Sequence, residues 1–318
     1  MATRRTDVGP VLPLALRLGD RVRLVSPASF PTQEWLDASV GILEGWGLVV
    51  EVGEHAMDQW GYMAGRDGDR LADLNDAFRD PGVRAIIATR GGAGAYRIAD
   101  RVDFDAVRAD PKPVVGFSDI TPLHLALWAQ CGLISIHGCL AGANAMSSVR
   151  HLLMTAEPLT IDRDAGAYSA AIEVPGAATG PLIGGNLRGV CGRIGVDLPR
   201  LDGAIVFLED FRKVGLGEVD RQLTQLINAG VLDGIAGVVL GLITGFDHHT
   251  DRGWTLLDVL DDRLGSLGVP VLGGINAGHG GVGVDGGPDQ HALPIGAPAT
   301  IDTAAGTLTV GPCVRDRR

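Results

Sequence analysis

The chain has 318 residues, of which 46% are hydrophobic and 20% charged, and its formal net charge is −11. This length and apolar content allow a sizeable core, favour two domains over one, and exclude a disordered chain. The negative charge, with no basic run beyond the chain ends, argues against nucleic acid and anionic membrane surfaces as partners.

No segment has the features of a targeting or membrane-spanning sequence. Pro13 and Arg17 interrupt the apolar run near the N-terminus, so it lacks a signal-peptide core, and residues 235–246 are too short and glycine-rich to span a membrane. The four cysteines are scattered without a C-x-x-C pair, which favours free thiols in a reducing cytoplasm. His248 and His249 lack metal-ligand spacing and are expected in a solvated loop. We therefore expect a cytoplasmic protein without a metal or an organic cofactor.

The first half of the chain alternates between two kinds of apolar pattern. Short β-branched runs predict strands at 21–25, 48–52, 83–88, 113–117 and 134–136, and helical periodicity predicts helices at 33–46, 67–79 and 120–129. This alternation indicates an α/β domain with a parallel sheet covered on both faces. Ligands of such sheets bind at the carboxyl ends of the strands.

The most informative segment is 111–132, where a buried strand is followed almost without a loop by an apolar helix. Gly116, Ser118 and Asp119 form the turn between them. A serine on such a bend matches the nucleophile elbow of hydrolases, and the helix N-terminus favours developing negative charge. The match to G-x-S-x-G is incomplete because Ile120 replaces the second glycine. The alternative is that Ser118 or Asp119 is an ordinary helix N-cap.

The alternation of strand-like and helix-like segments is lost between about 146 and 179, and a second region follows. Its patterns predict strands at 204–208, 235–241 and 269–272, helices at 219–228 and 254–264, and a β-hairpin at 299–311. We therefore expect an N-terminal α/β domain at 1–150, a linker at 151–180, and a β-rich α+β domain at 181–318.

A serine nucleophile needs a base and a group that orients the base. Glu209 closes an apolar strand and His279 follows another strand among glycines, which gives the order Ser118, Glu209, His279. This is the chain order of α/β-hydrolase triads. As alternatives, Glu209 is a helix-capping or surface carboxylate, for example paired with an arginine such as Arg212 or Arg221, and His279 is a satisfied loop histidine. Asp210 is the next candidate carboxylate.

The glycine-rich segment 88–97 does not have the spacing of a dinucleotide-binding or P-loop motif. Its better physical use is to supply an oxyanion donor. The backbone amides of Gly92 and Asp119, on neighbouring strand ends, are the expected pair.

Many ordered segments of the chain resemble the LD-carboxypeptidase family of serine peptidases, which includes the microcin-immunity peptidases. The similarity runs from about residue 20 to 310 and is carried by RVRLVSPAS, YMAGRDGDRLADLNDAFRDPGVRAIIATRGG, KPVVGFSDITPLHLALW, SIHG, GPLIGGNL, FLEDF, DRQLTQL, GVVLG and GHG. It implies a Ser118, Glu209 and His279 triad, an oxyanion hole from the Gly92 and Asp119 backbone, and a homodimer with clefts between domains. The chain departs from the family pattern at Ala93, between FLED and DRQL, and at 281–290.

The resemblance implies release of a C-terminal D-amino acid from an L,D-peptide bond in a cell-wall-derived peptide. The alternative within the family is hydrolysis of a toxic peptidyl- or aminoacyl-nucleotide, as in microcin immunity. Residues 145–180 offer a single aromatic residue near the expected cleft, Tyr168, which disfavours that reading. A binding protein without activity on the same scaffold is disfavoured because all three triad residue types are present.

Overall fold

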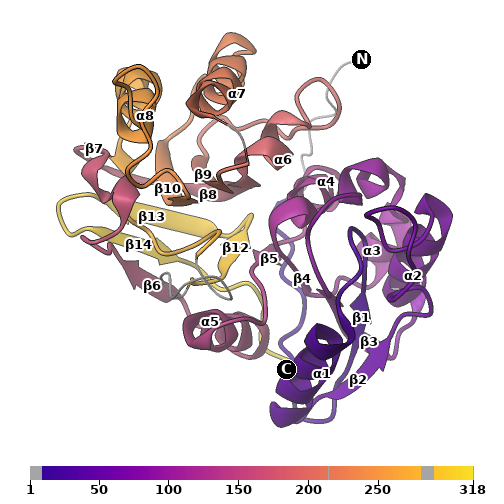
Figure 1. Ribbon diagram of the computed structural model, residues 1–318. Helices are drawn as coiled ribbons and strands as arrows, with labels where there is room; N and C mark the ends of the chain where they lie inside the picture. The colour runs from indigo at the N-terminus through magenta and orange to yellow at the C-terminus, as the bar shows by residue number, and fades with distance from the viewer. Residues whose placement is uncertain (1–8, 214, 281–289, 318) are drawn as a thin grey trace.

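The computed structural model describes residues 9–213, 215–280 and 290–317. Within these ranges the chain forms one sheet of six strands and one of eight, which lie side by side (Figure 1). The first sheet is drawn mainly in indigo to magenta and the second mainly in pink to yellow. No helix in the described ranges is long and apolar enough to cross a membrane.

The first sheet is parallel except at one edge. Its strands, in spatial order, are β12 (Leu293–Ile295), β5 (Ser135–His137), β4 (Val114–Gly116), β3 (Val83–Ala88), β1 (Arg21–Val25) and β2 (Val49–Val52). The β12 strand pairs antiparallel with β5, and all other neighbours are parallel. The register places Gly116 of β4 beside His137 of β5. The carboxyl ends of β1, β3 and β4 therefore meet at one edge, as the strand pattern predicts.

Helices connect and cover the strands of the first sheet, as expected for an α/β domain. They are α1 (Gln33–Gly45), α2 (Asp67–Arg79), α3 (Phe104–Ala109), α4 (Thr121–Cys131) and α5 (Ala143–Met154), with 3₁₀ turns η1 (Ala95–Arg97), η2 (Ala99–Arg101) and η3 (Ser118–Ile120). Thr32 caps α1 through its side chain, and Asp103 caps α3 in the same way. The predicted helices at 33–46, 67–79 and 120–129 are confirmed to within a few residues.

The second sheet joins an antiparallel half to a half that is parallel except at its edge strand. Its order is β6 (Leu159–Asp162), β14 (Thr307–Val310), β13 (Pro298–Asp302), β8 (Ala177–Asn186), β9 (Ile205–Phe211), β10 (Gly237–Thr244), β11 (Val271–Leu272) and β7 (Glu173–Val174). The long β8 pairs antiparallel with β13 through its first residues and parallel with β9 through its last. The hairpin predicted at 299–311 is formed by β13 and β14.

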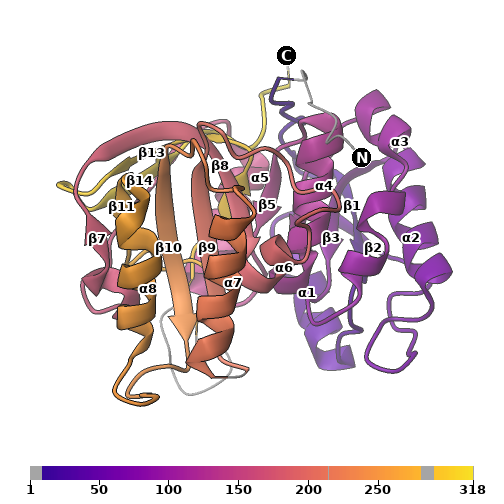
Figure 2. The same ribbon diagram turned by 90° about the horizontal axis from the view of Figure 1, so that it is seen from above.

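One side of the second sheet carries α6 (Leu187–Cys191), α7 (Leu216–Asn228) and α8 (Leu256–Leu264), which stand together in Figure 2. Two further 3₁₀ turns, η4 (Tyr168–Ala171) and η5 (Gly265–Leu267), lie in this half of the chain. Apolar faces of these helices pack with β8, β9 and β10 in the largest cluster of buried hydrophobic residues. This arrangement confirms the mixed α/β architecture with a strand-rich C-terminal region.

Residues 151–180, expected as a linker, instead contain the end of α5, then β6, η4, β7 and the start of β8. The edge strands β6 and β7 have four or fewer paired residues. They are therefore too short to show a clear alternation of apolar residues in the sequence. The later segment β12 returns to the first sheet. The chain therefore crosses between its two halves more than once, and the domain limits 1–150 and 181–318 stay a prediction.

The helix α4 lies at the junction of the two halves. It is buried on nearly all sides: Leu123 and Leu127 pack in the core of the first sheet, and Leu125 packs with α6 and β8 in the core of the second. A helix that is apolar all round is expected to be buried in this way. The residues that start α4 are therefore fixed by both halves of the molecule.

Candidate active site

Ser118 stands at a sharp bend between β4 and α4 and has a backbone φ of 60°. Residues other than glycine rarely adopt this left-handed conformation, and they keep it where the surrounding structure fixes them. A strained serine between a strand and a helix is the geometry of a nucleophile elbow. The backbone here agrees with the prediction made from residues 111–132.

Two glycines make room for this bend. A Cβ on Gly91 would lie 2.8 Å from the Cβ of Ser118 and 2.7 Å from the carbonyl oxygen of Phe117. A Cβ on Gly116 would lie 2.4 Å from the Cγ2 of Ile120. The space beside the serine therefore comes from Gly91, on the neighbouring strand end, and Gly116 admits the isoleucine that replaces the second glycine of the motif.

Hydrogen bonds hold the residues around Ser118. Asp119 accepts the backbone N–H of Ala95 at Oδ2 (2.9 Å), so it ties the elbow to the glycine-rich loop. The hydroxyl of Thr121 donates to the carbonyl oxygen of Ser118 (2.8 Å) and accepts the N–H of Asn186 from β8 (3.0 Å). Neither Ser118 nor Asp119 caps the helix through its side chain. The N-cap alternative is therefore wrong.

Burial raises the pKa of Asp119 to about 7, against the stabilising N–H groups of Ala95 and Gly94 and the charges of Lys213 and Arg70. Desolvation of a carboxylate disfavours its charged form, and here it outweighs the hydrogen bonds. Asp119 therefore changes protonation near neutral pH while it holds the loop that faces Ser118.

The loop at 91–95 is fixed from a second side by Ser29. Its hydroxyl donates to the carbonyl oxygen of Tyr62 (2.6 Å) and accepts the N–H of Ala93 (3.1 Å), and its backbone N–H donates to Gly91 (3.1 Å). Gly92 has a φ of 105° and lies against the Ser29 side chain. Gly92 and Asp119 line the same cavity as Ser118, which is the relationship expected of an oxyanion pair.

Glu209, on β9, is fully buried and bonded to His279. Its Oε2 lies 2.5 Å from Nδ1 of His279 and accepts the backbone N–H of the same residue at 3.0 Å. Although burial opposes ionisation, His279 and His137 hold the pKa of Glu209 below its usual value. The carboxylate therefore stays charged and fixes the orientation of the imidazole.

The alternatives for Glu209 do not hold in the structure. Arg221 pairs with Glu218, and the guanidinium of Arg212 lies over the ring of Phe246. The carboxylate of Asp210 binds Asn186, Arg188 and the backbone N–H of Phe211. Pairing of Glu209 with either arginine is wrong, and Asp210 is occupied by other groups.

Aromatic rings position His279 next to the elbow. Its ring centroid lies 4.6 Å from that of Phe117, the residue before the serine, and 4.3 Å from that of Phe211. The side chain of His279 is 18% exposed, so one part of it is open to solvent. In the described ranges no hydrogen bond joins His279 to Ser118; such bonds often form only when substrate is bound.

A cavity of about 270 Å³ opens at Ser118 and is called the Ser118 cavity below. It lies between the first sheet and the region after β8, and its lining includes Gly92, Tyr96, Ser118, Asp119, Pro122, Asn186, Arg188, Gly189, Gly192, Arg193, Phe211 and Lys213. A second, more apolar cavity of about 320 Å³ includes Phe117, Gly91 and His279 in its wall. The elbow and the histidine therefore lie where two cavities approach each other.

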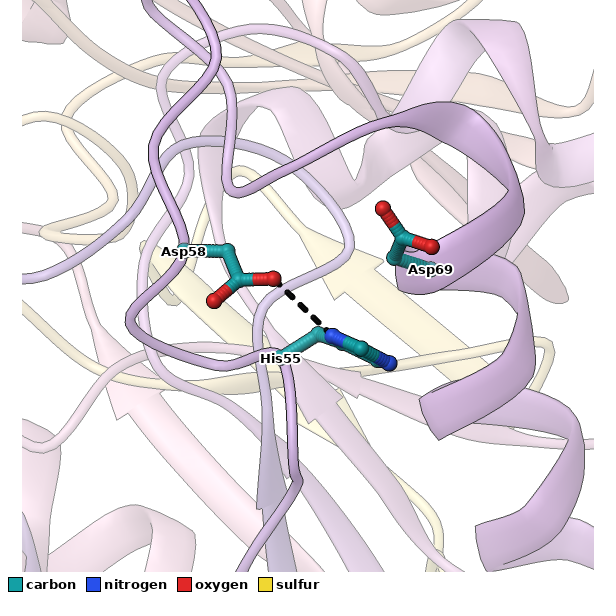
Figure 3. A group of neighbouring side chains, drawn as sticks. All are labelled: His55, Asp58 and Asp69. Carbon is teal, nitrogen blue, oxygen red and sulfur yellow. Dashed lines mark hydrogen bonds and ion pairs between the residues drawn. The ribbon is translucent and has the colours of Figure 1, made fainter.

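In the ranges that the structure describes, one group of side chains is close enough to hold a metal ion: His55, Asp58 and Asp69 (Figure 3). His55 Nδ1 lies 2.9 Å from Asp58 Oδ2, and Asp69 accepts the N–H of Arg66 at the start of α2. An ion pair and a helix cap account for these positions, and none of the three residues lines the Ser118 cavity. His248 is exposed and His249 packs near the ring of Phe246, as expected for a loop pair.

Sequence reasoning missed several residues of the site. Thr121 and Asn186 join the elbow to β8, Lys213 lines the Ser118 cavity, and His137 lies beside Glu209. The signal for His137 was its place after the predicted strand 134–136, at the same sheet edge as Ser118. Residues 281–289, which contain most of the departure noted at 281–290, lie outside the described ranges.

Comparisons with known proteins identify the family of the chain. Residues 22–138 match the LD-carboxypeptidase N-terminal domain, and residues 179–301 match the LD-carboxypeptidase C-terminal domain. A protein from Streptomyces coelicolor that is named as a carboxypeptidase is 38% identical, over 94% of this chain and 96% of its own length. A Bacillus subtilis protein named "Probable murein peptide carboxypeptidase" is 34% identical, over 94% of this chain and 93% of its own length.

The fold also matches solved structures. The crystal structure of an MccF-like protein from Bacillus anthracis superposes with a TM-score of 0.83 at 24% identity, covering 95% of this chain and 99% of that one. The N-terminal match includes Ser118, and the C-terminal match includes Glu209 and His279. The chain therefore belongs to the LD-carboxypeptidase family and is a serine carboxypeptidase.

Proposed function

We propose that this carboxypeptidase hydrolyses an L,D-peptide bond and releases the C-terminal D-amino acid of a cell-wall-derived peptide. In this proposal Ser118 is the nucleophile, His279 the general base and acid, and Glu209 the orienting carboxylate. The backbone N–H groups of Gly92 and Asp119 bind the oxyanion. The observation that carries the proposal is the buried Glu209–His279 pair, packed through Phe117 against a serine at positive φ.

The chemistry follows from the hydrogen bond at Nδ1 of His279. Because Glu209 holds that nitrogen, Nε2 is available to take the proton of Ser118 as its oxygen attacks the peptide carbonyl carbon. The carbonyl oxygen becomes an oxyanion, which the two backbone amides stabilise. His279 then gives its proton to the departing D-amino acid nitrogen. In the second step, water attacks the acyl-serine while His279 takes a proton from it, and His279 returns that proton to the Ser118 oxygen as the acyl bond breaks.

Among the cationic side chains that line the Ser118 cavity, one is placed to bind an acidic group of the substrate. Arg188 is bonded to Asp210 and to the carbonyl oxygen of Phe211, and Arg193 is paired with Asp197. Lys213, in contrast, is exposed, lies over the ring of Phe211 at 4.8 Å, and lines the cavity with Ser118. Its ammonium is therefore suited to bind the free carboxylate that distinguishes a carboxypeptidase substrate.

The second candidate function is cleavage of a peptidyl- or aminoacyl-nucleotide, since a solved structure of similar fold is titled "Microcin C7 self immunity protein MccF in complex aspartyl sulfamoyl adenosine". The same serine chemistry would serve it, so the reacting groups do not separate the two. The relative at 34% identity, named for murein peptides, favours the first candidate.

The experiment compares both substrates with one preparation of enzyme. We expect release of D-alanine from a murein tetrapeptide (L-Ala-D-Glu-diaminopimelate-D-Ala), and none from the same peptide ending in L-alanine. An aminoacyl sulfamoyl-adenosine is the competing substrate. Faster cleavage of the nucleotide than of the tetrapeptide would reject the murein assignment in favour of the immunity-type function.

We further propose that the enzyme is a cytoplasmic homodimer. Cys131, Cys191 and Cys313 are buried free thiols, which suits a reducing compartment. Sedimentation of the purified full chain tests the dimer: a monomer at micromolar concentration with full activity would contradict it.

A further inference from the structure

Glu209 has a second buried histidine beside it. Its Oε2 is bonded to His279, while its Oε1 lies 3.6 Å from Nε2 of His137. The side chains of Glu209 and His137 are 0% and 1% exposed. Among the described residues, neither that oxygen nor either ring nitrogen of His137 has a hydrogen-bond partner.

Unpaired buried polar groups are unfavourable, because each has lost its hydrogen bonds to water. Here a buried acceptor and a buried ring that can donate face each other, just beyond hydrogen-bond distance. A small movement of either side chain brings them into contact. We propose that His137 is a positioning residue of the catalytic site, which donates from Nε2 to Oε1 of Glu209 and so holds the carboxylate between two imidazoles.

The packing around His137 fixes its ring. Its centroid lies 5.0 Å from that of Phe117 and 5.7 Å from that of Phe207. The other titratable side chain facing it is His124 on α4, at 6.0 Å, which is bonded to the Ser135 hydroxyl and the Gly116 carbonyl oxygen. His124 is therefore occupied, and Glu209 is the polar group that His137 faces.

The contact also joins the two sheets. His137 ends β5, in register with Gly116 of the strand that leads to Ser118, whereas Glu209 belongs to β9 of the second sheet. A hydrogen bond from His137 therefore sets the carboxylate relative to the nucleophile strand. The inference rests on the proposed triad, since it assigns His137 a role through Glu209 and His279.

This role predicts a specific kinetic signature. His137 lines neither of the two cavities described above, so substrate binding does not depend on it directly. Loss of the donor would let Glu209 rotate and weaken its support of His279 in the transition state. A hydrogen bond to a charged group is worth enough to change a rate by at least about tenfold. We therefore expect kcat to fall while KM stays unchanged.

The first test needs no variant. Long-range ¹H–¹⁵N NMR of the histidine-labelled wild-type protein distinguishes the two neutral tautomers of His137. We expect the proton on Nε2; a proton on Nδ1 of a neutral ring would overturn the proposal. This measurement does not depend on the substrate, so its outcome is separate from that of the proposed function.

The second test compares His137→Leu, which removes the donor, with His137→Gln, whose side-chain amide restores one. The readouts are kcat and KM on the murein tetrapeptide and the rate of Ser118 labelling by a fluorophosphonate. We expect His137→Leu to lower kcat and the labelling rate at least about tenfold, and His137→Gln to recover most of the loss. His124→Gln, a change to the neighbouring buried histidine, controls for disturbed packing and should lower Tm with little change in labelling.

Suppose that Ser118 is labelled in the wild type and that folded His137→Leu is labelled at an equal rate. This result would reject the role of His137 and leave the triad intact. Absence of wild-type labelling would instead reject the proposed function. If His137→Leu does not fold, the test uses His137→Gln. A labelling rate that falls as far in His137→Gln as in His279→Ala would contradict the positioning role of His137.

Discussion

Gly91 lies directly against Ser118, so that a Cβ at residue 91 would come within 2.8 Å of the serine Cβ. The Gly91→Ala substitution must therefore push the elbow away from its position. A displacement of about 1 Å at a reacting group can cost roughly 100-fold in rate. We expect a loss of that order in kcat, measured on the folded fraction.

Gly41→Ala is the matched control for this change. Gly41 lies in the exposed middle of α1, where a Cβ meets nothing within 4 Å. Alanine should stabilise the helix by about 0.5–1 kcal/mol and leave turnover unchanged. Equal activity of the two variants would show that the contact of residue 91 with the elbow is unimportant.

Lys213→Ala tests the carboxylate site. The ammonium lines the Ser118 cavity, so its removal should raise KM for a tetrapeptide with a free C-terminus by about tenfold, the value of a hydrogen bond to a charged group. The C-terminal amide of the same peptide should respond to the change much less. Arg212→Ala is the control, because this neighbouring exposed cation lies over Phe246 and outside the cavity. Identical KM values for the two variants would remove Lys213 from substrate binding.

Glu209→Gln separates orientation from stability. Because the carboxylate orients His279 and supports its charge, we expect turnover to fall by up to about 10⁴-fold, with a folded protein. Lys112→Met provides the contrast: this buried lysine donates to the carbonyl oxygens of Ala77, Phe78 and Asp80 at the end of α2.

Loss of those bonds in Lys112→Met should lower the free energy of unfolding by about 2–3 kcal/mol and spare turnover per folded molecule. Tm and kcat are measured on the same preparations. A Glu209→Gln enzyme that keeps nearly full activity would exclude Glu209 from the triad.

The fold of the first sheet could be predicted in detail from the sequence. The strands at 21–25 and 83–88 and the helix at 67–79 have the predicted bounds, because local apolar patterns and turn residues define each of them. The short strand β12 could not be foreseen, since three residues that pair with a strand more than 150 residues earlier leave no local pattern.

The candidate site, like the fold, could be predicted only in part from the sequence. Ser118 and His279 follow predicted strands and Glu209 lies near the end of β9, so their residue types and order were visible. The approach of His137 to Glu209 depends on how the two sheets close on each other. The replacement of a motif glycine by Ile120 likewise became clear once Gly91 and Gly116 were seen to supply the space.

Asp119 gives a prediction on pH. Burial raises its pKa from 3.8 to about 7 in the folded protein, so the native state holds this proton more tightly than the unfolded chain does. The contribution of Asp119 to stability is therefore fully present below pH 4 and declines as the pH rises towards 7. Urea unfolding of the wild type and of Asp119→Asn at several pH values measures the contribution of Asp119 to the free energy of unfolding.

The stability of wild type relative to Asp119→Asn should fall between pH 4 and 7 and stay constant above. Other buried carboxylates contribute equally to both proteins and cancel in the difference. Parallel pH curves would show that the environment of Asp119 does not oppose its ionisation.

The most direct measurement is mass-spectrometric mapping of the residue that a fluorophosphonate modifies. We expect one adduct, on Ser118, that forms in wild type, is absent in Ser118→Ala, and forms several orders of magnitude more slowly in His279→Ala. Both variants should remain folded and release no measurable D-alanine. An unmodified Ser118 in an enzyme that still cleaves the tetrapeptide, or turnover by Ser118→Ala above a tenth of the wild-type rate, would contradict the assignment of Ser118 as the nucleophile.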